Sequence, residues 1–313
     1  MNGFSIIAEN IIVLGLAMLI GFICVKTGYI PKETKDALSK IIVKVTLPVL
    51  VMTSLTKLEL NGEKVINSVI IALSGLIIVG IMFLIGIITA RLFKMERPRA
   101  VMHACMSAFG NTVFVAYPLI QALYGDEGLL YAALFVFAND CYLWTLGVYK
   151  MSGVSEGKSS PGKNIKNLIN PATIAFGISF IMMIFKLQFG GPIKTVLTGV
   201  GSTTTYLSMF FIGGTLASVK FKDIYKRVSL FVIVAVKMLI IPFILIAVLK
   251  LFNINDTVRA VLVLQAAMPV STVVSILASE YKCDTIYSAE GVFITTVLSL
   301  ITIPVVYTVM NVF

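Results

Sequence analysis

The chain has 313 residues, of which 58% are hydrophobic and only 13% charged, and its mean hydropathy is +0.99. Soluble domains are about half apolar and about a quarter charged, so this composition excludes a soluble enzyme, a nucleic-acid-binding domain and a secreted scaffold. Since a membrane-spanning helix takes about 20 mostly apolar residues, we expect an all-α polytopic membrane protein. The net charge of +10 then belongs to loops beside the membrane.

Apolar runs separated by polar residues predict ten transmembrane helices. Their expected ranges are 5–25, 37–55, 65–90, 99–124, 127–149, 168–186, 194–219, 227–250, 256–281 and 284–311. The longest polar connection, 151–167, is rich in Ser, Gly and Lys. We expect it to be a cytoplasmic linker between a first five-helix repeat, 1–150, and a second five-helix repeat, 168–313.

The distribution of positive charge predicts the orientation. Of the 25 Lys and Arg residues, 16 fall in odd-numbered loops, 6 in even-numbered loops and 3 within spans. Cytoplasmic loops carry the excess of Lys and Arg, so we expect both termini outside the cell membrane. With five spans in each half, the second half must run opposite to the first.

Short internal matches support this inverted repeat. At an offset of 160 residues, 99–101 (Arg-Ala-Val) recurs at 259–261 and 112–113 (Thr-Val) recurs at 272–273. Inverted repeats are typical of secondary transporters.

The predicted fourth and ninth spans each contain a helix-breaking sequence. In the fourth span a Gly-Asn pair, Gly110 and Asn111, is followed by Pro118, and the ninth contains Pro269. Proline lacks an amide hydrogen and clashes with the preceding turn. Interrupted spans in corresponding positions of two halves indicate a binding site, because broken backbone is tolerated in a membrane only where protein or a water-filled cavity satisfies it. A simple proline kink is the alternative, and it is what we expect of Pro48, Pro242 and Pro304.

These segments resemble the auxin efflux carrier family, the bacterial carriers related to plant PIN proteins and to malate and malonate permeases. The resemblance to its first crossover motif rests on Asn111, Thr112, Pro118, Leu119, Ala122, Tyr124 and Gly125. The resemblance to its last two helices rests on the Gln-Ala-Ala-Met-Pro run 265–269 and on Leu277, Ala278, Tyr281, Asp284 and Pro304. Ala116 stands where the family usually has glycine.

The resemblance implies a ten-helix fold in which the broken fourth and ninth helices cross at the membrane midplane. Substrate would bind beside the crossing, and one domain would carry it across by an elevator-like motion. Family substrates are organic anions, including carboxylates and auxin. The expected substrate-binding residues are Asn111, Thr112, Pro118, Asn139, Gln265, Pro269, Ser271 and Thr272.

Several of these residues have structural alternatives. The amide of Asn111 donates to a carboxylate, or it caps the helix that follows the break. Gln265 binds substrate or satisfies carbonyl groups freed by the proline. The role of Asn139 comes from the resemblance, since the family has a polar amide at this position of the fifth helix.

Three charged residues within predicted spans are candidates for coupling or charge pairing. Asp140 is a proton site, a cation ligand or a structural partner, since an intramembrane carboxylate is costly unless it is paired, protonated or hydrated. Lys237 lies deep in its span, and we expect it to pair with a carboxylate, Asp140 or Glu290. Lys44 guides an anion inward or has a structural role. His103 is expected to be packed or interfacial.

The leading hypothesis is a secondary transporter of a small organic anion. The alternatives are a sodium- or proton-coupled symporter or antiporter of the bile-acid-symporter type and, third, a channel. Neither a metalloprotease motif nor a nucleotide-binding motif is present, so an enzyme, a metal site and a cofactor are not expected. The expected partners are the organic anion, a coupling proton or sodium ion and the lipid bilayer, with no nucleic acid. A homodimer remains open.

Overall fold

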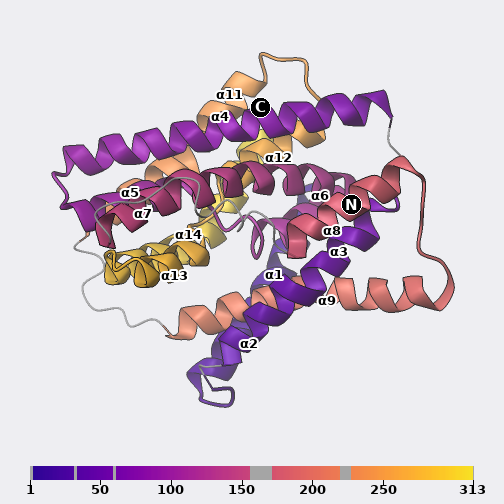
Figure 1. Ribbon diagram of the computed structural model, residues 1–313, viewed down its shortest axis with the longest axis horizontal. Helices are drawn as coiled ribbons and strands as arrows, with labels where there is room; N and C mark the ends of the chain where they lie inside the picture. The colour runs from indigo at the N-terminus through magenta and orange to yellow at the C-terminus, as the bar shows by residue number, and fades with distance from the viewer. Residues whose placement is uncertain (1–2, 32–33, 59–60, 156–170, 219–226, 313) are drawn as a thin grey trace. The chain divides into compact units, whose positions relative to one another are not determined.

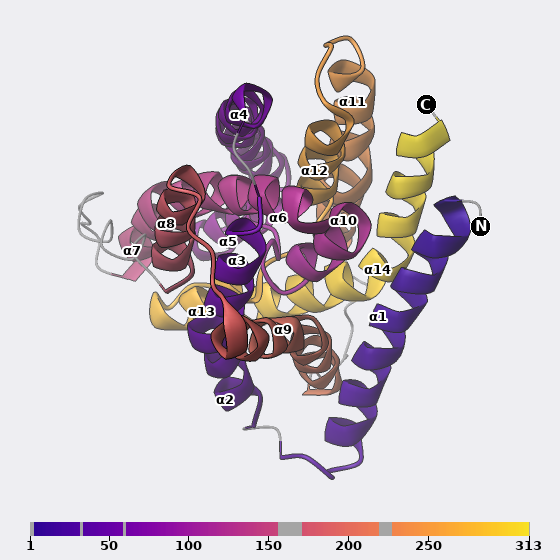
Figure 2. The same ribbon diagram turned by 90° about the vertical axis from the view of Figure 1, so that its right-hand side faces the viewer.

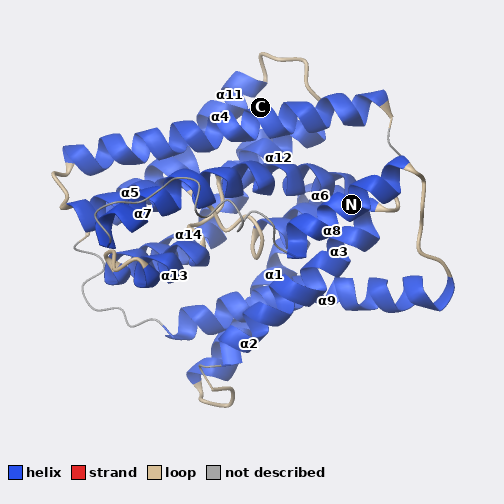
Figure 3. Cartoon of the chain, viewed as in Figure 1, coloured by secondary structure: helices blue, strands red, loops and turns tan. Residues whose placement is uncertain are grey.

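The computed structural model describes residues 3–31, 34–58, 61–155, 171–218 and 227–312, which are helix and loop without strands (Figure 3). The helices are α1 (Gly3–Lys26), α2 (Thr34–Ile41), η1 (Ile42–Thr46), α3 (Leu47–Leu55), α4 (Gly62–Leu92), α5 (Arg97–Ala108), α6 (Ala116–Tyr142), η2 (Leu143–Gly147), α7 (Val148–Ser155), α8 (Pro171–Ile184), α9 (Gly191–Ser218), α10 (Val228–Ala235), η5 (Val236–Ile240), α11 (Ile241–Leu249), α12 (Asp256–Ala266), α13 (Thr272–Glu280) and α14 (Thr285–Val312). Most of the predicted linker 151–167 lies outside the described residues.

Several of these helices are long and apolar enough to cross a membrane. Within the described residues, five helical segments have the length and the apolar composition of a membrane-spanning helix: Ala37–Leu55, Gly62–Leu92, Ala116–Val154, Val228–Leu249 and Thr285–Val312. The predicted fourth and ninth spans are each divided into shorter helices, and a half of this length does not cross a bilayer by itself. The chain is therefore multi-pass, while the count of ten spans and their inverted repeat stay predictions.

Two π-helical turns, η1 and η5, lie directly before prolines. Pro48 and Pro242 each stand two residues after the π-turn, inside the continuous helical segments Ala37–Leu55 and Val228–Leu249. Each proline lacks the amide hydrogen that would bond to a carbonyl of the preceding turn. The wider π-turn accommodates the change of helical register that a proline imposes. The same turns contain the two candidate lysines, Lys44 and Lys237.

The described chain divides into two compact units. The first comprises Met1–Val69, Val113–Ala133 and Ile169–Ser218, apart from the gaps given above. Its helices α1 and α9 pack against each other (Figure 1). A Cβ atom added at Gly21 or Gly213 would overlap the backbone of the facing helix. Glycine is therefore what lets these helices approach closely, as in many membrane-helix pairs.

The second unit comprises Ile70–Thr112, Leu134–Leu168 and Val219–Phe313, with the same gaps. In it α11 and α12 lie side by side (Figure 2), and buried Ile246, Val263 and Val306 join them to α14. A Cβ atom at Gly86 of α4 would lie 2.7 Å from the Cα atom of Ala104, so α4 and α5 also touch through a glycine. This unit contains the segment that follows α5, as far as Thr112, and the whole interruption between α12 and α13.

Candidate functional site

The predicted interruptions are present in both segments. Helix α5 ends at Ala108, and α6 begins at Ala116. Pro118 lies in the first turn of α6, where a helix tolerates proline. Helix α12 ends at Ala266 and α13 begins at Thr272, with Pro269 between them. A further bend at Gly125, with φ 62° and ψ −153°, divides α6 near the predicted boundary between the fourth and fifth spans.

The two interrupted segments pair with each other in a short antiparallel bridge. Gly110 faces Val270. The amide of Asn111 donates to the carbonyl of Pro269 at 2.6 Å, and that of Ser271 donates to the carbonyl of Phe109 at 3.1 Å. These bonds satisfy backbone groups that the helices leave free, as burial requires. We call residues 109–111 and 269–271 the bridge.

Two further contacts fix the bridge in place. The amide of Val270 donates to the Oγ1 atom of Thr295 on α14 at 3.0 Å. A Cβ atom at Gly110 would lie 3.2 Å from the Cβ of Met268, closer than side chains normally pack. The absence of a side chain at Gly110 is therefore what allows the segments to approach.

Most predicted binding residues lie at or next to this bridge and are buried. Asn111, Thr112, Gln265 and Ser271 have at most 8% of their surface exposed. The Oγ atom of Ser271 accepts the amide hydrogen of Val273 at 3.3 Å, so this serine caps the start of α13. The bridge thus brings together polar side chains that are far apart in the sequence, beside the positive end of a helix.

Asn139 and Asp140 follow each other on α6. The Nδ2 atom of Asn139 lies 3.4 Å from the Oδ1 atom of Asp140. The Oδ1 atom of Asn139 is buried and has no hydrogen-bond partner within the part of the chain that the structure describes. A buried polar atom of this kind is available to a bound ligand, ion or water.

The side chain of Lys237, which belongs to η5, reaches the C-terminal end of α5. Its side chain is 1% exposed, and its Nζ atom donates to the carbonyls of Ala108 at 2.9 Å and Ser107 at 3.3 Å. The expected carboxylate pairing is corrected, since the contacts among the described residues are with these carbonyls and Glu290 pairs with Arg227 instead. A cation here satisfies carbonyls that a helix end leaves free and interacts favourably with its negative dipole end.

The remaining two predicted residues, Lys44 and Pro118, belong to the first unit. Lys44 is exposed on η1. Its contribution to an anion path stays a prediction.

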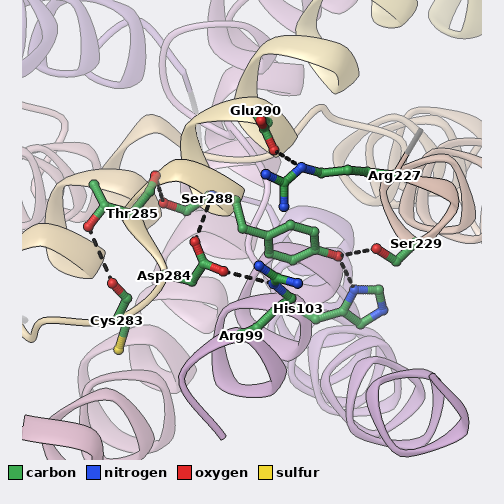
Figure 4. Close-up of polar contacts among 10 residues, drawn as sticks. Arg99, His103, Arg227, Ser229, Cys283, Asp284, Thr285, Ser288 and Glu290 are labelled. Atoms are coloured by element: carbon green, nitrogen blue, oxygen red, sulfur yellow. Dashed lines mark hydrogen bonds and ion pairs between the residues drawn. The ribbon is translucent and has the colours of Figure 1, made fainter. Parts of the chain in front are cut away.

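The sequence did not predict two ion pairs in the second unit, which Figure 4 shows with their neighbours. The Nε atom of Arg99 lies 2.8 Å from Asp284, and the Nε atom of Arg227 lies 2.6 Å from Glu290. The charges at the predicted span ends were visible in the sequence. Their pairing joins residues up to 185 positions apart, and no local pattern indicates it.

A hydrogen-bonded chain centred on His103 lies beside these pairs. The Nε2 atom of His103 lies 2.9 Å from the hydroxyl of Thr89, and its Nδ1 atom lies 2.8 Å from the hydroxyl of Tyr287. Tyr287 in turn donates to Ser229 at 2.9 Å. The histidine is fully buried, which confirms that it is packed, and in its neutral form one ring nitrogen donates while the other accepts. This chain links α4, α5, α10 and α14.

Comparison with known proteins gives a match over almost the whole chain. The profile of a family described as membrane transport protein matches residues 6–307. An uncharacterized transporter of Methanothermobacter thermautotrophicus is 25% identical over 300 residues, which are 95% of this chain and 96% of the relative. An uncharacterized transporter of Methanocaldococcus jannaschii is 24% identical over 306 residues, which are 94% of this chain and 96% of the relative.

Proposed function

The chain belongs to the membrane transport protein family, and from this premise we propose that it is a secondary transporter of a small organic anion. The substrate is a carboxylate or an auxin-like acid. It crosses the cell membrane after binding beside the bridge between the interruptions that follow α5 and α12. A ten-helix inverted repeat with both termini outside is part of this proposal, as is the bacterial source.

The observation that carries the proposal is the pairing of two interrupted helices at buried polar residues. The backbone amide of Asn111 donates a hydrogen bond to the carbonyl of Pro269 in the bridge. Interrupted backbone of this kind is typical of transporter binding sites. The positive end of α13 begins directly after the bridge, at Thr272. The ammonium group of Lys237 lies at the end of α5, where it donates to the carbonyl of Ala108, two residues before Gly110. Positive helix ends and a cation favour a negatively charged substrate.

The division into two compact units supports an elevator-like mechanism. Each unit is assembled from separate parts of the chain, so the segments that cross between the units are available as hinges. The bridge lies within the second unit, which is then the unit that carries the substrate. Alternating access in transporters is largely rigid-body motion of one part of the protein against the other.

Coupling to sodium or protons, in symport or antiport, is the second candidate function. The supporting observation is Asp140 beside Asn139, whose Oδ1 atom lacks a partner among the described residues. A carboxylate next to an unpartnered amide oxygen offers two oxygen ligands to a cation, or one site to a proton. A channel is the third candidate, and the interrupted helices favour alternating access over it.

Flux into proteoliposomes tests the proposal. Labelled malate, malonate and indole acetate are offered with and without imposed proton and sodium gradients. We expect saturable flux of at least one acid, and the gradient that accelerates it identifies the coupling ion. Absence of flux for all three acids would leave the family assignment intact and contradict the organic-anion proposal.

Two substitutions of Asn111 separate substrate binding from helix capping. Removing a hydrogen bond to a charged group costs about 1.5–3 kcal/mol, so Asn111→Ala should lower flux about tenfold or more. Asn111→Asp keeps the size and the capping ability of the side chain but repels an anion, and we expect it to abolish flux as well. Normal flux in Asn111→Asp would assign the residue to capping. The matched control is Asn311→Ala, on an exposed asparagine at the end of α14.

A further inference from the structure

A cavity of about 690 Å³ lies in the second unit, and its lining does not include the bridge residues. It is lined by the C-terminal part of α4, the start of α5 and α7. Its apolar lining includes Phe83, Ala90 and Ala104, which are themselves buried, and Ile87. The volume is within the range of small-molecule binding sites, about 300–1,000 Å³.

Positive side chains complete the lining. Arg91, Arg97 and Lys150 are exposed and border the cavity, and none of the described residues that line it is acidic. Arg97 is held in place, because its Nη2 atom donates to the carbonyl of Gly153 on α7 at 2.8 Å. The cavity therefore combines three cationic groups with an apolar wall, in a region that the charge distribution predicts to be cytoplasmic.

We propose that this cavity binds the headgroup of an anionic phospholipid. The phosphate lies among the three cationic side chains, and the acyl chains follow the apolar wall. Beyond the wall, α4 continues as an exposed apolar face that includes Ile81, Leu84 and Ile88. A soluble anion would leave the apolar wall without a contact, and a zwitterionic lipid would leave the three positive charges without a net negative partner. Basic pockets between membrane helices on the cytoplasmic side are suited to anionic headgroups.

Native mass spectrometry of the purified full chain tests the proposal with three probes. Phosphatidylglycerol supplies charge and tails, phosphatidylcholine with the same acyl chains supplies tails without net charge, and glycerol phosphate supplies charge without tails. We expect saturable binding of phosphatidylglycerol well above that of the other two. Equal binding of phosphatidylcholine would overturn the proposal. Glycerol phosphate binding as tightly as phosphatidylglycerol would also overturn it and would assign the cavity to a soluble phosphate ester.

The charge requirement is tested by replacing Arg91, Arg97 and Lys150 together with Gln. Each basic residue next to an anionic headgroup contributes a factor of about five to affinity, so the triple variant should bind phosphatidylglycerol about a hundredfold more weakly. Affinity unchanged in this variant would contradict the proposal.

A second triple variant, with Lys186, Lys194 and Lys250 replaced by Gln, is the matched control. These lysines are exposed and do not line the cavity. These three lysines fall in even-numbered loops, which the charge distribution predicts to lie on the opposite side of the membrane from the cavity. We therefore expect the affinity of this variant to stay within about threefold of the wild type. An equal loss of phosphatidylglycerol affinity in both triple variants would mean that the overall charge of the protein, and not the cavity, determines binding. That result would overturn the proposal.

A filling substitution tests the cavity without changing any charge. Ile87→Trp places a larger apolar side chain in the wall, and we expect it to weaken phosphatidylglycerol binding at an unchanged unfolding temperature. Wild-type affinity in this variant would place the lipid on the basic surface outside the cavity and contradict the proposal.

Discussion

Replacing Lys237 by Met removes a buried charge while keeping most of the side-chain volume. The ammonium group donates to the carbonyls of Ala108 at 2.9 Å and Ser107 at 3.3 Å, and both acceptors lie at the end of α5. A hydrogen bond from a charged group contributes about 1.5–3 kcal/mol. Since the second bond is long, we expect a total loss of about 3 kcal/mol. Met leaves both carbonyls without this donor in a site that is 1% exposed.

Thermal unfolding of the purified protein in detergent measures this loss. For a chain of this size, about 2 °C of unfolding temperature corresponds to 1 kcal/mol, so Lys237→Met should unfold about 6 °C below the wild type. Lys250→Met is the control, because Lys250 is exposed at the end of α11, and we expect a shift of less than 2 °C. A Lys237→Met protein as stable as the control would refute the reasoning. It would mean that the cost of burying the charge cancels its two hydrogen bonds.

Two further predictions concern packing and surface charge. Gly213→Ala should destabilise the first unit by about 1–3 kcal/mol, as overpacking does, because the added Cβ atom overlaps the carbonyl oxygen of Met18. Gly199→Ala on the same helix meets nothing within 4 Å and should be neutral or stabilising in the same unfolding assay; equal shifts would contradict the close approach of α1 and α9. A double-mutant cycle of Arg99→Gln and Asp284→Asn should give a coupling of about 0.5–1 kcal/mol that falls with added salt, because Arg99 is 45% exposed. A coupling that salt does not change would argue against a screened ion pair.

The glycine and proline positions explain why the interruptions were predictable from sequence. Pro269 has no amide hydrogen to donate to a helix carbonyl, and the residue directly before it is biased away from helical angles. At the first interruption, Gly110 and Asn111 follow the end of the predicted helix, and Pro118 stands seven residues after Asn111. Such effects act within a few residues, so they are visible without knowledge of the packing.

The partners of Lys237 show what the sequence alone could not predict. A buried ammonium group needs acceptors, and Asp140 and Glu290 were the obvious ones in a list of charged residues. Carbonyls freed by an interrupted helix serve the same purpose, but they carry no signature in the side-chain sequence. The acceptor that Lys237 reaches depends on how the segment from α10 to α11 packs against α5. This packing is a property of the tertiary structure.

Local and compositional properties were therefore determined by the sequence itself: the membrane class, the helical content, and the places where helices are interrupted. They follow from the cost of placing polar groups in lipid and from backbone chemistry near proline and glycine. Contacts between distant residues were decided only by the tertiary structure. The bridge between Gly110 and Val270, the Arg99–Asp284 pair and the basic cavity beside α4 all depend on chain segments that approach only after the helices pack.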